Sequence, residues 1–193
     1  MGTFEGQLAG WFDADAVPRT EAQAHAAVTE LVHQYSATLY RVAYSVTRNA
    51  GDAEDVVQET FLRVLRHCEK LNELRDTRVW LVRIAWNLVL DRKRRSKARP
   101  EAEDIDDLVR VLPAKDRAAD EEMIATQGHA RILRLIDELP AKEREVLLLS
   151  AIDELSTVEI AGILGTTEST IRSRIFRARR MLGGKLEEKA GNR

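Results

Sequence analysis

Apolar residues recur at spacings of three and four along most of this chain, and few helix-breaking residues interrupt them. From Thr20 onward, Leu31, Tyr35, Leu39 and Val42 fall on one face of a helix, because an α-helix makes one turn in about 3.6 residues. Only 10 Gly and 4 Pro occur among the 193 residues, and 32% of the residues are charged. This composition is typical of solvated helices rather than of a β-barrel or a β-sandwich. The pattern predicts an all-α fold.

The helical patterns fall into two groups, separated by a stretch rich in acidic residues. Residues 100–126 hold nine Asp or Glu against three Lys or Arg and show only a weak period. The expected architecture is two small helical domains joined by an acidic flexible linker, the second domain containing a helix-turn-helix. The expected boundaries are a loose N-terminal arm over 1–19, the first domain over 20–97, the linker over 98–126, the second domain over 127–186 and a tail over 187–193.

Three helices are expected in the first domain. The first ends where Asn49 and Gly51 interrupt the apolar pattern, and Asp52 and Thr77 are expected to cap the second and third helices. On the second helix the apolar positions share one face and the charged positions share another. The charged face is therefore left to meet a partner.

The net charge of the chain is −2, but its basic residues are concentrated in two segments. Residues 83–99 carry seven Lys or Arg against Asp91 alone, and residues 168–182 carry five Arg against Glu168 alone. A single run of this kind is commonly a solvated helix face. Two runs, each on an amphipathic helix, favour contact with nucleic acid.

The sharpest motif consists of a short helix, a glycine turn and an arginine-rich helix. Ser156 and Glu159 have the spacing of a capping box, Gly165 permits a left-handed turn, and Thr167 caps the second helix. This is the layout of a helix-turn-helix, whose second helix enters the major groove of DNA; an ordinary helical hairpin with a solvated basic helix is the alternative. With Ile171, Ile175, Ala178 and Leu182 inward, the outward face presents Ser169, Arg172, Ser173, Phe176, Arg177 and Arg180.

A second basic surface is expected on the third helix of the first domain. Arg83, Asn87 and Arg94 share one face there, with Trp80 and Trp86 beside it. Aromatic rings next to cations stack on unpaired bases and hold the backbone of single-stranded nucleic acid. Core packing is the alternative for either Trp, but the two lie about 240° apart around the helix. We therefore do not expect both on one core stripe.

The sequence argues against an enzyme and predicts neither a metal nor a cofactor. Asp52, Glu54, Asp55 and Glu59 resemble a set of metal ligands or acid/base carboxylates, but three of them lie in the first turn of a helix, where carboxylates interact favourably with its dipole. No phosphate-binding Gly loop or catalytic triad motif occurs. The single Cys68 cannot form an internal disulfide. Aliphatic runs are short and no secretory signal is present, so we expect a cytoplasmic protein without membrane insertion of its own.

Four segments together resemble the extracytoplasmic-function (ECF) sigma factors, which are two-domain initiation subunits of bacterial RNA polymerase. The resemblance covers about residues 28–97, as sigma region 2, and 128–186, as region 4. The occurrence of all four segments in this order, around an acidic linker, makes the resemblance specific. The segments are DAEDVVQETFLRV at 52–64, WLVRIAWNLVLD at 80–91, LPAKEREVLLL at 139–149 and EIAGILGTTESTIRSRIFRARRML at 159–182.

The resemblance implies partners for each surface. The charged helix would bind the clamp helices of core RNA polymerase, the third helix and the loop over 72–78 would hold unpaired bases of the −10 promoter element, and the arginine-rich helix would read the −35 element as a duplex. It also implies an anti-sigma factor that masks both domains. The residues so implied are Asp52, Asp55, Gln58 and Glu59 for the polymerase; Arg83, Asn87, Trp80, Trp86 and Arg94 for the −10 element; and Thr167, Ser169, Arg172, Ser173, Phe176, Arg177 and Arg180 for the −35 element.

Two other interpretations stay open from the sequence. A helix-turn-helix regulator would bind duplex DNA without polymerase and use its first domain for dimerisation. A nucleic-acid enzyme would use the acidic helix and a metal, and would require magnesium-dependent strand cleavage that is lost in Asp55→Asn. Co-purification with core polymerase distinguishes the sigma factor from the regulator.

Overall fold

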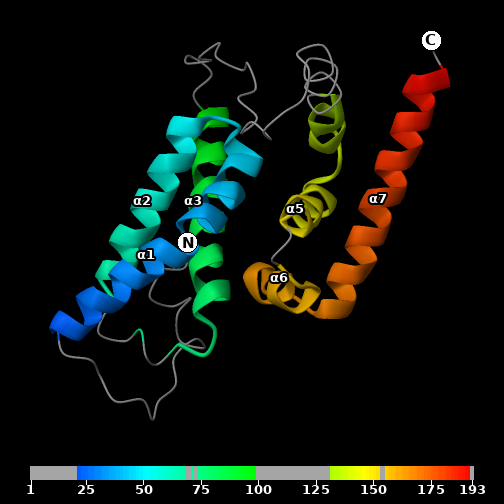
Figure 1. Ribbon diagram of the computed structural model, residues 1–193. Coiled ribbons are helices and arrows are strands. Elements are labelled where there is room, and N and C mark those ends of the chain that lie inside the picture. The colour runs from blue at the N-terminus through cyan, green and yellow to red at the C-terminus, as the bar shows by residue number, and fades with distance from the viewer. Residues whose placement is uncertain (1–20, 68–70, 72–73, 99–130, 153–154, 192–193) are drawn as a thin grey trace, which may run out of the picture. The chain divides into compact units, whose positions relative to one another are not determined.

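The computed structural model describes residues 21–67, 71, 74–98, 131–152 and 155–191. The expected N-terminal arm lies outside these residues, as does the acidic linker apart from Ala98, which ends a helix. The described elements are all α-helices, so the predicted all-α class is confirmed (Figure 1). The chain divides into two compact units, of which the first carries α1, α2 and α3, and the second carries α5 and α7.

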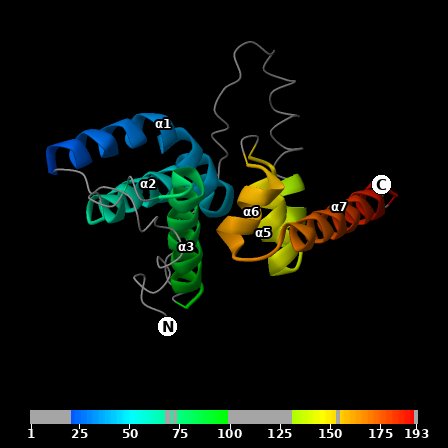
Figure 2. The same ribbon diagram turned by 90° about the horizontal axis from the view of Figure 1, so that it is seen from below.

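The first unit is a bundle of α1 (Glu21–Thr47), α2 (Ala50–Leu65) and α3 (Thr77–Ala98), each of which contacts the other two (Figures 1 and 2). Its core is built from apolar residues that recur on the inner faces of the helices, because burial of such a face is the main force that stabilises a small bundle. The buried residues of α1 and α2 include Leu39, Val42, Ala43, Ala53, Val56, Phe61 and Val64.

α3 is buried around most of its circumference. It contacts both α1 and α2, and Trp80 and Trp86 are only 1% and 2% exposed. The expectation that one of these Trp residues lies off the core is therefore wrong. A helix that is apolar on most sides becomes a central helix, and neither indole ring presents a face to solvent on which a base could stack.

A two-residue link joins α1 to α2. Arg48 adopts a φ of 54°, in the left-handed region, and the Asn49 side chain accepts a hydrogen bond from the backbone N–H of Asp52 at 3.0 Å. Asn49 is thus the N-cap of α2, and the prediction that Asp52 caps this helix is wrong. The cap expected at Thr77 is also one residue late, since the Asp76 side chain accepts a bond of 3.0 Å from the first turn of α3. A capping side chain must precede the first helical residue.

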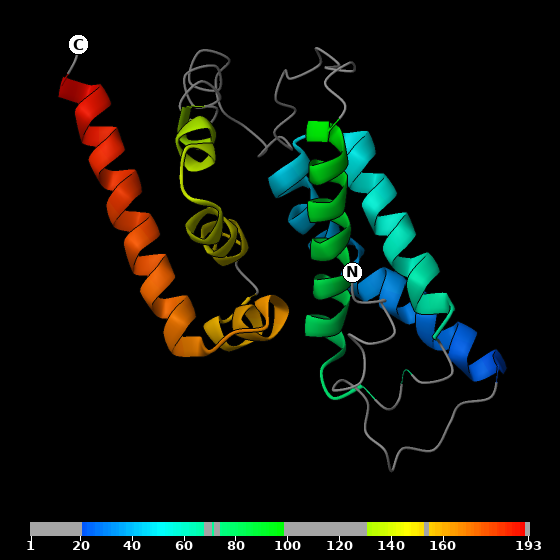
Figure 3. The ribbon, with the colours of Figure 1, turned by 180° about the vertical axis from the view of Figure 1, so that it is seen from behind.

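The second unit contains a helical segment over 131–137, α5 (Ala141–Ser150) and α7 (Glu168–Gly191), and α5 packs against α7. Along the chain, α6 (Thr157–Leu164) connects α5 to α7 and leads into α7 through a short turn (Figure 3). The buried residues of this unit include Leu135, Leu139, Val146, Leu149, Ile152, Ile171 and Ala178.

The turn between α6 and α7 has the predicted glycine geometry. Gly165 has a φ of 62°, a conformation that glycine adopts without a Cβ penalty. The N–H of Thr166 donates to the carbonyl oxygen of Ala161 at 3.0 Å, which is the bond of a Schellman motif. The helix-turn-helix expected from the sequence is present.

Both predicted caps of this motif are also present. The backbone N–H of Ser156 donates to Oε2 of Glu159 at 2.7 Å, and the N–H of Glu159 donates to Oγ of Ser156 at 3.2 Å, which completes a capping box. The N–H of Thr170 donates to Oγ1 of Thr167 at 3.3 Å. The start of each helix is therefore fixed by its own side chains.

α7 is longer than the sequence pattern predicted, since it continues past Leu182 to Gly191. Gly183 and Gly184 do not end it, although glycine disfavours a helix interior. Beyond them, Nζ of Lys185 donates to Oε2 of Glu138 at 2.6 Å and ties the extension to the segment before α5. This pair spans 47 residues of sequence, and no local pattern predicts it.

Replacing Gly183 and Gly184 with Ala should stabilise the chain by about 0.5–1 kcal/mol each, because Ala loses less backbone freedom on folding. A Cβ at either position meets no atom within 4 Å. Urea unfolding followed by circular dichroism measures the change. Gly165→Ala is the control and should destabilise by about 1–2 kcal/mol, the cost of a left-handed L-residue; a destabilising effect of both helix substitutions would contradict the open surroundings of α7.

Candidate nucleic-acid and protein interfaces

The outward face of α7 carries the side chains that the sequence assigned to duplex DNA. Ile171 and Ala178 are fully buried on the opposite side of the helix, whereas Phe176 is 68% exposed. A large exposed aromatic side chain on a helix is unusual unless it serves a contact. All seven predicted residues, Thr167, Ser169, Arg172, Ser173, Phe176, Arg177 and Arg180, are exposed.

Arg172 is linked to α6 through a shared carboxylate. Its NH2 donates to Oε1 of Glu168 at 2.6 Å, and the Thr157 hydroxyl donates to the same oxygen at 2.6 Å. These two hydrogen bonds, that of Thr157 above all, hold the pKa of Glu168 below its usual value. Glu168 therefore ties the start of the arginine-rich helix to the start of α6.

Arg177 is paired across the unit with α5. Its Nε donates to Oε1 of Glu143 at 3.2 Å, and the Glu143 side chain is only 13% exposed. Two residues further along α5, burial raises the pKa of the half-buried Glu145 against the opposing effect of nearby arginines and a lysine. Neither Glu143 nor Glu168 is among the residues predicted for this surface. The spacing of four between Glu168 and Arg172 is a pattern that can be recognised in the sequence. Glu143 and Arg177 are 34 residues apart, so no local pattern pairs them.

The acidic face of α2 lies at the surface of the first unit. Asp52, Asp55 and Gln58 are exposed, and the half-buried Glu59 accepts a hydrogen bond from Nε of Arg63 at 3.0 Å. Three of the four residues predicted for polymerase binding therefore lie fully at the surface, and the fourth is oriented by its neighbour one turn away.

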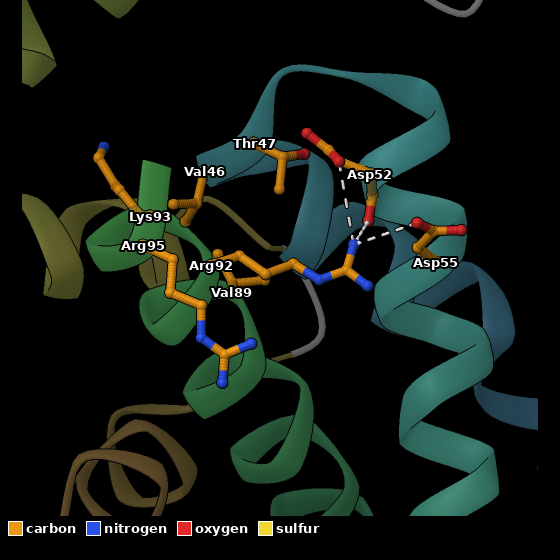
Figure 4. A pocket seen from close by; sticks show the side chains of 8 residues that line it. All are labelled: Val46, Thr47, Asp52, Asp55, Val89, Arg92, Lys93 and Arg95. Atoms are coloured by element: carbon orange, nitrogen blue, oxygen red, sulfur yellow. Dashed lines mark hydrogen bonds and ion pairs between the residues drawn. The ribbon is translucent and has the colours of Figure 1, made fainter. Parts of the chain in front are cut away.

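Arg92 of α3 reaches across to this face at one edge of an open cleft of about 630 Å³ (Figure 4). Its NH1 lies 3.2 Å from the carbonyl oxygen of Asp52, 3.9 Å from Oδ1 of Asp52 and 3.4 Å from Oδ2 of Asp55. Lys93 and Arg95 line the same cleft but point away from these carboxylates. Arg92 is not among the residues predicted for this face, because its partners lie 37 and 40 residues earlier in the sequence.

The residues predicted for the −10 element differ in their placement on α3. Arg83 and Asn87 are half-buried, while Arg94 is exposed and its NH2 lies 2.7 Å from Oδ1 of Asp91. Their spacings of four and seven keep them on one side of the helix. Trp80 and Trp86 are buried, as described above, and the expected loop over 72–78 is described only from residue 74 onward.

In the described part of the chain, no helix combines the length and the apolarity that a membrane span requires. Among the same residues, no three His, Cys, Asp or Glu side chains are arranged so that they could hold a metal ion.

A helix-turn-helix with an exposed, arginine-rich second helix, preceded along the chain by a separate bundle with an acidic face, defines a protein that binds DNA and also presents a surface for another protein. Family models agree with this class: the model of sigma-70 region 2 matches residues 31–99, and the model of sigma-70 region 4 matches residues 129–182.

Relatives with related sequences share one description. The chain is 30% identical over 168 residues to the ECF RNA polymerase sigma factor SigW of Bacillus subtilis, covering 84% of this chain and 90% of SigW. It is 32% identical to SigL of Mycobacterium tuberculosis, covering 86% and 93%. Against SigE of Mycolicibacterium smegmatis it is 38% identical over 79% of this chain, but it spans only 59% of the length of that relative. The chain belongs to the ECF RNA polymerase sigma factors.

Solved structures with the same fold support this assignment. The structure of CnrH in complex with the cytosolic domain of CnrY matches with a TM-score of 0.62 at 29% identity, covering 87% of this chain and 95% of CnrH. RpoE of Bartonella quintana, solved with the anti-sigma factor NepR, matches with a TM-score of 0.61 at 23% identity, covering 82% and 96%. The second match is a likeness of fold.

Thr157→Val should raise the pKa of Glu168 toward its usual value, because the Thr157 hydrogen bond is the largest single cause of the shift. Since the folded-state pKa lies below the unfolded one, ionised Glu168 stabilises the fold above the unfolded pKa, and this contribution is lost as pH falls through the folded pKa. The variant should therefore lose less stability on acidification than the wild type. An NMR titration of the Glu168 carboxyl checks this, and an unchanged pKa would contradict it.

Proposed function

We propose that this chain directs core RNA polymerase to promoters by binding the polymerase through α2, unpaired −10 bases through α3 and the −35 duplex through α7, with no catalysis of its own. The observation that carries the proposal is the outward face of α7, where Phe176 is exposed among arginines on the second helix of a helix-turn-helix. Membership in the sigma factor family supports the polymerase as partner.

On α7, the chemistry of the exposed residues fits the edges of base pairs in the major groove. Arg177 and Arg172 can donate to guanine or to phosphate, Ser173 can donate or accept, and the Phe176 ring can contact a thymine methyl group. The remaining candidates, Thr167, Ser169 and Arg180, flank this set on the same exposed side and would contact the phosphates that fix the register.

On α2, the exposed carboxylates suit a basic partner such as the clamp helices of the polymerase. Opposite charges steer and orient docking of this kind. The contacts of Arg92 with Asp52 and Asp55 do not block it, because the two Asp side chains are 58% and 62% exposed. Exposed ion pairs of this type contribute little stability, so the polymerase can replace Arg92 at little cost.

On α3, Arg83, Asn87 and Arg94 are proposed to hold the −10 element. Asn87 can hydrogen-bond the edge of an unpaired base, and the two arginines can contact the backbone. The buried state of Trp80 and Trp86 leaves them as supports for α3 rather than as stacking surfaces in this conformation.

The solved relatives point to a regulatory partner. CnrH and RpoE were each determined with a second protein bound, the cytosolic domain of CnrY and the anti-sigma factor NepR. By likeness to these two complexes, we propose that this chain also binds a partner protein, of the anti-sigma kind that NepR represents, and that it acts in the cytoplasm, where its polymerase partner works.

The chain reconstituted with core bacterial RNA polymerase should produce run-off transcripts from a pool of genomic fragments, and Asp55→Lys with Glu59→Lys should abolish them. We expect polymerase affinity to fall about tenfold or more, because two complementary charges become repulsive. Glu30→Lys on the exposed side of α1 is the matched control and should transcribe normally. Wild-type chain that fails to co-purify with polymerase, yet binds duplex DNA, would indicate a stand-alone regulator instead.

Asn87→Ala should impair promoter opening or −10 choice while leaving polymerase affinity unchanged, because a base-edge contact acts only on unpaired DNA. Permanganate reactivity of thymines measures opening, and fluorescence anisotropy measures polymerase binding. Gln34→Ala removes an exposed amide from α1 and serves as the control. Loss of polymerase binding in Asn87→Ala would place this residue at the protein interface instead.

A further inference from the structure

Two arginines on the outward face of α7 use different nitrogens to bind carboxylates. Arg177 is bound to Glu143 through Nε, and Arg172 is bound to Glu168 through NH2. A guanidinium has five N–H donors in a fixed plane, and two terminal donors can pair with O6 and N7 of one guanine. Which nitrogen is occupied therefore decides which edge of the guanidinium remains for DNA.

The terminal edge of Arg177 stays available. A carboxylate on Nε leaves the four N–H donors of NH1 and NH2 unoccupied by that contact, and the Arg177 side chain is 53% exposed. In Arg172 the carboxylate occupies one N–H of a terminal nitrogen at 2.6 Å, so that a two-point contact with one guanine through both terminal nitrogens would be made beside a bound carboxylate. Arg177 keeps both terminal nitrogens clear of its carboxylate and is thus the better placed of the two for base reading.

Glu143 is itself firmly placed. It lies in the first turn of α5, its backbone N–H donates to the carbonyl oxygen of Pro140 at 3.1 Å, and its side chain is 13% exposed. A carboxylate in the first turn of a helix interacts favourably with the helix dipole. Because α5 packs against α7, the carboxylate is a fixed point to which Arg177 is attached.

We propose that Glu143 is the positioning residue for Arg177, holding its guanidinium with the terminal edge directed outward so that this arginine specifies one base pair of the −35 element. The inference rests on the proposed role of α7 in reading that element. An arginine that is ordered before binding loses less side-chain freedom when it contacts the base.

If Glu143 positions Arg177, its removal should change DNA affinity and sequence discrimination in opposite directions, which no other role of Glu143 would do. Glu143 also places a negative charge beside the DNA-binding face, and such a charge weakens attraction to phosphate whatever the sequence. Its removal should therefore raise affinity for random DNA and lower discrimination between sequences. Loss of folding would lower both quantities, and a purely electrostatic role would raise affinity for all sequences without changing discrimination.

The test uses the full chain reconstituted with core bacterial RNA polymerase and a duplex library randomised over the −35 region. Sequencing of the bound and unbound fractions gives the discrimination at each base pair. Glu143→Gln should lower discrimination roughly three- to tenfold at the one base pair that Arg177→Ala affects, a part of what a two-point guanine contact supplies. In the Arg177→Ala background it should cause no further loss.

Two control variants separate position from charge. Glu138→Gln removes a carboxylate that also pairs with a cation of α7, Lys185, and it should leave discrimination unchanged at every base pair. Glu143→Asp keeps the charge but withdraws the carboxylate by one methylene, and it should lower discrimination without raising affinity for random duplex. Circular dichroism of each variant verifies that α5 and α7 remain helical.

Three results would overturn the proposal: a uniform effect of Glu143→Gln at all base pairs, an additional loss in the Arg177→Ala background, or an equal effect of Glu138→Gln. Arg177→Ala distinguishes this failure from failure of the proposed function. If that variant discriminates at every base pair as well as the wild type, Arg177 does not read the −35 element and its part in the proposed function is wrong. If it loses discrimination at one base pair while Glu143→Gln does not, the positioning role alone is wrong.

Discussion

The burial of Ile171 and Ala178 determines what α7 can present to a partner. These residues lie seven positions apart, about two helical turns, and both are fully buried. Their burial fixes the rotation of the helix about its own axis, so that Phe176 and the serines and arginines around it face outward. The Schellman turn at Gly165 then sets where the helix begins. The face that this unit presents therefore depends on packing on the opposite, buried side of the helix.

Carboxylates accompany the arginines in both units. Arg92 contacts the acidic face of α2, Arg172 shares Glu168 with Thr157, and Arg177 is attached to α5. These pairs are partly exposed, and their net contribution to stability is small. Their main effect is on geometry, because each restricts a long side chain that would otherwise sample many rotamers. The same residues that give the chain its basic segments are thereby held in defined places.

Local chemistry accounts for the parts of the fold that the sequence predicted well. The capping box at Ser156, the cap at Thr167 and the turn at Gly165 involve residues at most five positions apart, and the periodic apolar pattern orients α7. The burial of Trp80 and Trp86 was missed because it depends on helices that pack on α3 from elsewhere in the chain. The caps of α2 and α3 were misplaced by one to three residues, since Asn, Asp and Thr are all acceptable at such positions.

In the candidate site, too, the local features were predicted from the sequence and the long-range contacts were not. The exposed face of α7 follows from helical periodicity, whereas the partners of Arg92 and Arg177 lie more than 30 residues away in sequence. The i, i+4 pairs of Glu168 with Arg172 and of Glu59 with Arg63 could have been identified beforehand. Side chains that orient a functional residue from another helix leave no local pattern, and they become visible only when the packing is known.

The pairing of Arg172 and Arg177 with carboxylates of the same chain affects how tightly such a protein binds the many non-promoter sites of a genome. The chain has a net charge of −2, and carboxylates lie against Arg172 and Arg177, two of the cations proposed to face DNA. Release of counterions supplies most of the affinity for DNA of random sequence, so a subunit of this kind gains little by binding the chromosome alone. Sites that lack a promoter then compete weakly for it, and the free pool remains available for capture by another protein.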